Sequence, residues 1–135
     1  MSGAASVLRA AVATALREDA ALLARLNGVF EGPAVRASTP YAEVAEALAI
    51  DWGTKDRVGR EVRIAVLIRH AAETSGELVE LAEAAEAAVL AVPRDLPGWA
   101  LVNMVFVRSR IAGEGPGRWI ASVEFRGRML AAGGA

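Results

Sequence analysis

Apolar residues in the first part of the chain recur at the spacing of a helix. Leu8, Val12 and Leu16 are four positions apart and the alanines between them favour helix, so the pattern predicts a helix over residues 6–26. Charged residues interrupt the apolar stripe at Asp19, which is a good N-cap for the residues that follow it. We therefore expect a bend or a second short helix to begin there.

The next apolar segments are shorter, and one of them is ambiguous. Residues 29–31 predict a single edge strand, and the loop that follows ends at Thr39 and Pro40. Thr39 followed by Pro40 is typical of a helix start, which favours a helix over residues 41–52. The same segment also fits a strand, because four large apolar residues then share one face, and periodicity alone does not separate the two: Val44, Leu48, Ile50 and Trp52.

Alternation of apolar and polar residues predicts three longer strands, over residues 60–70, 99–110 and 118–130. The glycine-rich segment 113–117 between the last two is too short to hold a crossover, so we expect these strands to form a hairpin. The clearest alternation lies in the first strand, where the apolar positions are Val62, Ile64, Val66 and Ile68.

A helix is predicted over residues 74–92, between the first of these strands and the hairpin. Thr74 and Glu77 match a capping box, and Pro93 ends the helix. The apolar stripe consists of Leu78, Leu81, Ala82, Ala85 and Val89.

Together these elements predict an α+β fold, with a largely antiparallel sheet of about four strands and two main helices packed on one face. No segment is rich enough in Ser, Pro or Gly to divide the chain, so we expect residues 1–135 to form a single domain. Only residues 131–135 have the composition of a frayed tail.

The composition narrows the class of protein. The chain has 135 residues and is 54% apolar, but no apolar run reaches the roughly 18 to 20 residues of a membrane-spanning helix. Arg9 and Arg17 fall where a signal peptide would need its apolar region. Cysteine is absent, which excludes disulfides, thiolate nucleophiles and cysteine-bound metals. We therefore expect a soluble protein made in the cytoplasm, without a membrane partner.

Charge is distributed by region, although the formal net charge is only −1. Residues 73–92 carry five glutamates and no basic residue, which gives −5, and residues 99–130 carry five arginines against two glutamates, which gives +3. If copies pack head to tail in a ring, the acidic helix of one copy could face the basic strands of the next. In the alternative interpretation, the acidic and the basic region are both ordinary solvent-exposed surfaces.

Little in the sequence indicates catalysis. His70 is the single histidine, and no serine motif or metal-ligand spacing accompanies it. The glycines of segment 113–117 join two strands, whereas a phosphate-binding loop joins a strand to a helix. We therefore expect neither enzymatic activity nor a cofactor or metal site.

One cluster of carboxylates suggests a less favoured alternative, a metal-dependent nuclease. Asp51, Asp56 and Glu61 lie around Lys55, and such enzymes hold Mg²⁺ with carboxylates. However, Arg63 stands where a lysine is expected, and arginine does not release its proton at working pH. An ordinary solvated loop explains the cluster better, and a small α+β module that binds proteins is the other alternative.

Four short motifs occur in a particular order along the chain. They are Asp19 to Leu22, Thr39 to Tyr41, Asp51-Trp52-Gly53-Thr54-Lys55, and Gly59-Arg60-Glu61 leading into an apolar strand. This order resembles the tail completion proteins, the tail terminators of long-tailed phages and of phage-like gene transfer agents. The resemblance covers about residues 5–130.

The resemblance implies a structural role in a phage-like particle. Six copies would close as a ring on the head-proximal end of the tail tube, stop its polymerisation and join the tail to the neck. The implied partners are further copies of the chain, the tail tube protein, a neck or head-connector protein, and DNA that passes through the lumen without sequence-specific binding. The resemblance also implies that residues 41–50 form a strand.

Two loops are then the expected assembly contacts, because loops on a rigid sheet usually carry such contacts. They are the turn of residues 52–59 and the hairpin tip of residues 112–118. Trp52 and Trp119 are the expected anchors, since Trp is enriched where binding energy concentrates, although burial in the subunit's own core is an equally good interpretation. The candidate residues are Trp52, Thr54, Lys55, Arg57, Arg60, Glu114, Arg118 and Trp119.

Overall fold

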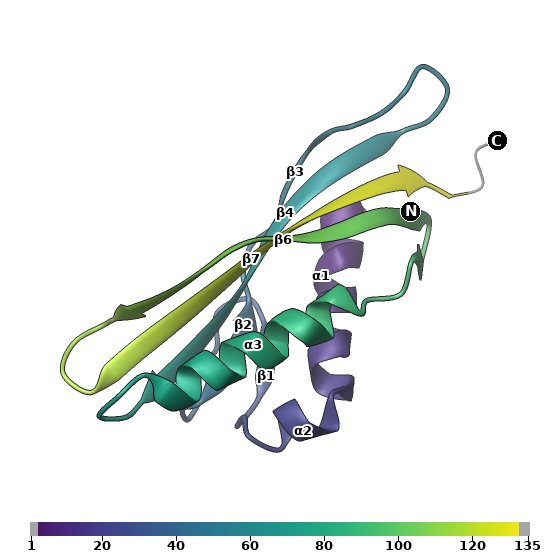
Figure 1. The fold of residues 1–135 in the computed structure, drawn as a ribbon. Helices are drawn as coiled ribbons and strands as arrows, with labels where there is room; N and C mark the ends of the chain where they lie inside the picture. Colours follow the sequence, from purple (N-terminus) through teal and green to yellow (C-terminus); the bar gives the residue numbers. More distant parts are fainter. Residues whose placement is uncertain (1–2, 133–135) are drawn as a thin grey trace.

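A computed structural model describes residues 3–132 and contains three helices beside one sheet (Figure 1). The helices are α1 (Ala4–Glu18), α2 (Ala20–Leu23) and α3 (Gly76–Leu90). The predicted break at Asp19 is confirmed, because its carboxylate accepts a hydrogen bond of 3.0 Å from the Leu22 N–H and starts α2. None of the helices within residues 3–132 is long and apolar enough to cross a membrane.

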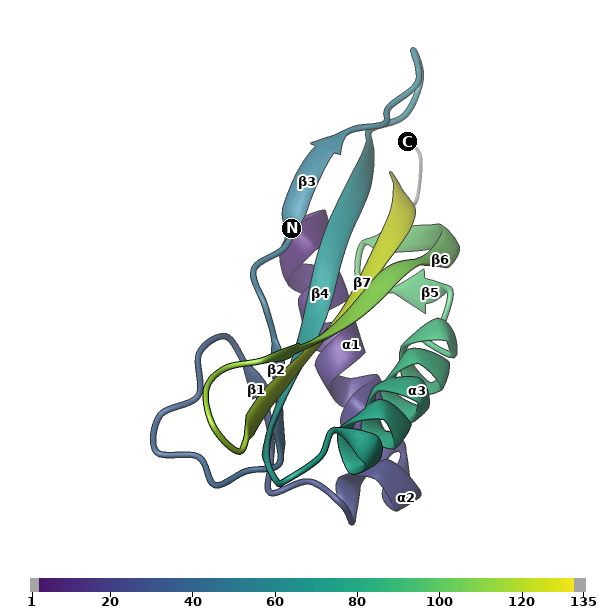
Figure 2. The same cartoon turned by 60° about the vertical axis from the view of Figure 1, so that its left-hand side comes forward.

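The sheet has seven strands within the described part of the chain, and three of them are long. In chain order they are β1 (Val29–Glu31), β2 (Tyr41–Val44), β3 (Leu48–Asp51), β4 (Gly59–Ala71), β5 (Asp95–Leu96), β6 (Trp99–Gly113) and β7 (Arg118–Ala131). The order across the sheet is β1-β2-β4-β7-β6-β5, and β3 pairs with β4 beside β2. Figure 2 shows how strongly the long strands twist across one another.

One face of the sheet is buried under α1 and α3. On β4 and β7 every second residue is apolar and buried, because successive side chains of a strand point to opposite faces. These rows meet the apolar stripes of the two long helices, so the core lies between one helical layer and one sheet (Figure 1). The core residues of largest volume include Phe125, Leu8, Leu16, Ile68, Leu78, Leu81 and Met129.

The predicted α+β class and the two main helices on one face agree with the structure, but the predicted number of strands is wrong. We expected about four strands, whereas β1, β2, β3 and β5 extend the long strands to a sheet of seven. The sheet is also mixed, because β1 pairs with β2 in parallel while the other pairs are antiparallel. β1 lies where the edge strand was predicted, at residues 29–31, whereas β5 was not predicted, because its two residues are too few for a clear period.

The ambiguous segment is extended, as the resemblance implied, but it forms two short strands and not one, and the helix interpretation of Thr39 and Pro40 is wrong. β2 pairs with the second half of β4 and β3 with its first half, with a short connection between them. Pairing with the long strand β4 gives the backbone N–H and C=O groups of both segments hydrogen-bond partners. This tertiary contact overrides the local helix signal.

Two further details of the prediction need correction. The helix over residues 74–92 was expected to begin with a capping box at Thr74, but α3 begins after Ser75 and its N-cap makes no side-chain hydrogen bond. Ala131 belongs to β7, whereas residues 133–135 of the predicted frayed tail lie outside the described residues.

Replacement of Phe125 by alanine should destabilise the fold strongly. Phe125 is fully buried at the centre of β7 and packs edge to face with Phe106, so its loss leaves a cavity in the core. We expect the free energy of unfolding in urea to fall by about 3–5 kcal/mol. The control variant Ser109→Ala, on the exposed part of β6, should stay within about 0.5 kcal/mol of the natural chain. Similar losses in the two variants would contradict this picture of the core.

Candidate functional site

The turn between β3 and β4 is held by its own side chains. Asp51 Oδ1 accepts a hydrogen bond from the Gly53 N–H at 3.1 Å, and Thr54 Oγ1 accepts from the Arg57 N–H at 3.1 Å. Below the turn, the Trp52 N–H donates to the Gly59 carbonyl at 3.0 Å. The turn therefore has a defined shape and projects beyond the end of the sheet (Figure 1).

Four of the five candidate residues in this turn have contacts within the subunit. The Arg57 guanidinium donates to the Ala131 carbonyl at 2.6 Å, and Arg60 forms an ion pair of 3.5 Å with Asp51. Trp52 is half-buried and lies under the guanidinium of Arg128, 5.5 Å from the ring centroid. Thr54 shapes the turn, and only Lys55 is exposed without a hydrogen-bond or ion-pair partner among residues 3–132.

The hairpin tip between β6 and β7 is closed by backbone bonds and two left-handed glycines. The Glu114 N–H donates to the Arg118 carbonyl at 2.8 Å, and Gly115 and Gly117 have φ values of +123° and +68°. Glu114 forms an ion pair of 3.4 Å with Arg69 on β4. Arg118 is exposed and has no side-chain partner within the part of the chain that the structure describes.

Trp119 is attached to the subunit rather than free at the tip. Its Nε1–H donates to the Ala72 carbonyl at 3.1 Å, and the Ala72 N–H donates to the Gly117 carbonyl at 2.9 Å. The ring is half-buried, as is that of Trp52, so each tryptophan is partly in its own subunit and partly accessible.

The structure does not bring the two predicted contact regions together. The turn precedes β4, whereas the tip lies at the other end of this strand, where Ala71 pairs with Arg118 (Figure 1). A strand of 13 residues is about 40 Å long at roughly 3.3 Å per residue. The candidate residues therefore form two separate surfaces at opposite ends of the sheet.

The sheet face opposite the helices carries a cluster of charges that the sequence analysis missed. Glu61 is largely buried and lies 3.1 Å from Arg128, 3.6 Å from Arg63 and 4.0 Å from Arg126. Alternation predicts that these residues point outward, but only the register of β4 on β7 places them around one carboxylate. The cluster therefore neutralises part of the basic charge within the subunit.

Similar pairing reduces the other regional charges. Glu124 pairs with Arg108, and the hydrogen bond and charge of Glu124 raise the pKa of Arg108 above its ordinary value. On α3, Arg25 lies 3.3 Å from Glu80 and 3.9 Å from Glu77, and Glu77 also contacts His70 Nε2 at 2.8 Å. The arginines of the hairpin without a side-chain partner within residues 3–132 are Arg110 and Arg118, and the corresponding glutamates from 73 to 92 are Glu73, Glu83 and Glu86.

The carboxylates of the nuclease alternative are not arranged as a metal site. Asp51 is exposed and paired with Arg60, and Glu61 is surrounded by arginines. No group of three or more His, Cys, Asp or Glu side chains within residues 3–132 could hold a metal ion. The guanidinium groups occupy the positions around Glu61 that a cation would need.

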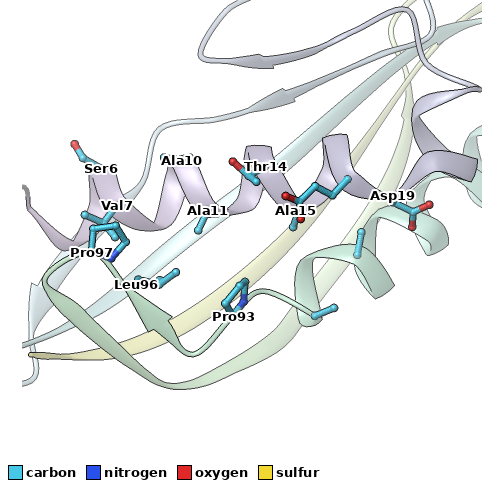
Figure 3. Close-up of a pocket in the computed structure, with 13 residues that line it drawn as sticks. Ser6, Val7, Ala10, Ala11, Thr14, Ala15, Asp19, Pro93, Leu96 and Pro97 are labelled. Atoms are coloured by element: carbon cyan, nitrogen blue, oxygen red, sulfur yellow. The ribbon is translucent and has the colours of Figure 1, made fainter.

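A groove of about 640 Å³ between α1 and the segment after α3 is a second feature that the sequence did not indicate. Figure 3 shows small side chains of α1 facing Pro93, Leu96 and Pro97 across it. The alanine-rich pattern of α1 could have indicated a shallow surface, but the position of the opposite wall depends on the tertiary fold. The lining consists of Ser6, Val7, Ala10, Ala11, Thr14, Ala15, Glu18, Asp19, Ala88, Ala91, Pro93, Leu96 and Pro97.

Comparison with known proteins gives a family and a similar fold. The family model described as "Tail completion protein gp17" matches residues 10–129. A chain of the solved structure "Virion of native gene transfer agent (GTA) particle" has a TM-score of 0.85 and a sequence identity of 23%, over 96% of this chain and 100% of that chain. No curated protein sequence matches the chain.

Gly59→Ala should disturb the turn and the start of β4. A Cβ atom at Gly59 would lie 2.5 Å from the Trp52 carbonyl oxygen, which is backbone and cannot move aside without opening the turn. We expect a loss of about 1–3 kcal/mol in the free energy of unfolding, measured by urea denaturation. Gly113→Ala is the matched control, since the nearest atom to its Cβ would be 3.9 Å away. Equal stability of the two variants would show that the turn is not constrained as described.

Proposed function

The chain belongs to the tail completion protein gp17 family, and on this premise we propose that it caps the head-proximal end of a phage-like tail tube as a ring. The cap ends tube polymerisation and joins the tail to the neck of the capsid. The single observation that carries this proposal is the family match over residues 10–129. The family is one of structural virion proteins and not of enzymes. The similar chain from a gene transfer agent virion supports a place in such a particle.

The two separate contact surfaces suit this role. A subunit that ends a tube must bind the last tube ring on one side and the neck on the other. The turn of residues 52–59 and the hairpin tip of residues 112–118 lie at opposite ends of the sheet, about 40 Å apart. Each end can therefore contact a different partner while DNA passes through the lumen of the ring.

A ring of identical subunits is the proposed form of the cap, with six copies as the expected number. Head-to-tail contacts between identical chains close into rings when the rotation between neighbours allows closure. Addition of the protein to purified tail tubes, followed by negative-stain microscopy, tests the function. We expect a cap at one end of each tube and shorter tubes when the protein is present during polymerisation. A chain that stays monomeric and leaves both tube ends bare would exclude this function.

Lys55→Glu should weaken capping without affecting the fold. Lys55 is exposed at the tip of the β3–β4 turn and has no intramolecular partner within residues 3–132, so its replacement breaks no contact inside the subunit. We expect an unchanged melting temperature and an affinity for tube ends that is weaker by about tenfold. The measurement is the fraction of capped tubes against protein concentration.

Ala21→Glu serves as the control for this variant, because it adds negative charge to the exposed surface of α2, which lies at the opposite end of the molecule from the turn (Figure 1). The control should cap like the natural chain. If both variants cap normally, the turn is not a contact with the tube.

A further inference from the structure

Both sides of the sheet end in strands with an unpaired edge. Within residues 3–132, β3 pairs only with β4, and β6 from Val102 to Gly113 pairs only with β7, since β5 reaches just the first two residues of β6. In the strand order these two edges lie on opposite sides of the sheet, because β3 is next to β4 and β6 is next to β7. Unpaired N–H and C=O groups on an edge strand are a template for pairing with another chain.

The side chains on these edges are more apolar than edge protection normally allows. Leu48 and Ile50 on β3 are 64% and 48% exposed, and Val107 on β6 is 40% exposed. Natural edge strands are usually protected by charges, prolines or coverage by a loop. β3 has neither proline nor lysine, and its one charged residue, Asp51, stands at its end and is paired with Arg60, while all four residues of the strand are exposed.

On β6, charges and bulges restrict what can pair. Arg108 and Arg110 lie on the exposed part of the strand, and register shifts occur between Leu101 and Asn103 and between Phe106 and Arg108. Two β6 edges placed together would oppose these arginines, and like charges directly opposite each other are unfavourable. Glu46 precedes β3, is exposed and has no partner within residues 3–132, as Arg110 has none, so the two edges complement each other.

We propose that β6 of one copy pairs with β3 of a second copy, which joins the sheets of neighbouring subunits edge to edge. This inference rests on the proposed ring and identifies its subunit contact. The partner of β6 is thus β3 of a second copy of this chain, and the partner of β3 is β6 of a third copy. Because the two edges differ, the contact is head to tail and repeats around a closed ring.

Strand direction agrees with this pairing. β3 and β7 both run antiparallel to β4, and β6 runs antiparallel to β7. Around a ring whose axis follows the strands, every β4 points the same way. The β3 of the next copy then lies antiparallel to β6, so the alternation of the long strands continues across the boundary.

Backbone hydrogen bonds define which residues face outward. The Trp52 N–H binds the Gly59 carbonyl, so by alternation Ala49 and Asp51 direct their N–H and C=O groups away from β4. The Glu114 N–H binds the Arg118 carbonyl, so by the same rule Ser109 directs its backbone groups away from β7. With Ala49 opposite Ser109, Glu46 lies diagonally across from Arg110, within reach of long side chains.

The resulting ring would have an open centre. Each copy contributes β3, β4, β7 and β6 to the continuous sheet, so six copies contribute roughly 24 strands. Barrels of about 16–18 strands already enclose an aqueous channel. A closed sheet of this size is thus compatible with the passage of DNA.

Disulfide cross-linking tests the contact directly, because the natural chain has no cysteine. Mixed Ala49→Cys and Ser109→Cys variants should form a covalent dimer on oxidation, since paired strands place their Cα atoms within disulfide range. The double variant should form a ladder of species that ends in a closed ring. Each single variant alone, and Ala49→Cys mixed with Ala87→Cys on the exposed side of α3, are the controls and should stay uncross-linked. Each mixture is oxidised alone and with the tail tube protein present.

Charge reversal gives an independent measurement that leaves the fold unchanged. Glu46→Arg and Arg110→Glu each break no ion pair within residues 3–132, and each should reduce the yield of the Ala49–Ser109 cross-link by about tenfold. The combination of both reversals in one chain should restore the yield.

The outcomes separate this inference from the proposed function. If the protein caps tubes but the Ala49–Ser109 cross-link does not form, the edge pairing is wrong and the capping function still holds. The same conclusion follows if charge reversal does not change the yield of this cross-link. A protein that neither self-associates nor caps tubes, alone or with the tube protein, would overturn both.

Discussion

The fold depends on burial of one face of the sheet. The long strands β4 and β7 place an apolar residue at every second position, and α1 and α3 cover this row with their own apolar stripes. Val66, Val123 and Phe125 are fully buried at its centre. Because all of the helical cover lies on this face, the other face and both edges of the sheet stay accessible. The positions available for assembly follow from this one-sided core.

The open face is kept compatible with water by pairing charges within the subunit. Glu61 lies among three arginines of β4 and β7, and Arg108 is paired with Glu124. This arrangement uses the basic residues that the sequence concentrates after residue 99. Fewer unpaired charges are therefore left than the regional totals suggest, which weakens the expected attraction between the acidic helix of one copy and the basic hairpin of the next.

The sequence predicted the elements that carry a clear period and failed where distant contacts decide. β4, β6, β7 and the two long helices were found because their alternation or stripe extends over ten residues or more. β2 and β3 were expected as one strand only through the resemblance, and β5 was not predicted, because segments of two to four residues are strands only through pairing with their neighbours. For the same reason the candidates Arg57 and Arg60 proved to hold the turn in place, since the Ala131 carbonyl that binds Arg57 is 74 residues away.

Accessible edges are a risk for a protein that acts alone and an advantage for one that assembles. A monomer with apolar side chains on β3 and a long unpaired β6 could aggregate through these strands. The bulges and arginines of β6 limit pairing between identical edges, yet they leave β3 as an acceptable partner. Because β6 pairs poorly with another β6 but can pair with β3, head-to-tail assembly is favoured over random association of edges. Under the proposed role, the same one-sided core that stabilises the subunit also leaves it the surfaces that a ring requires.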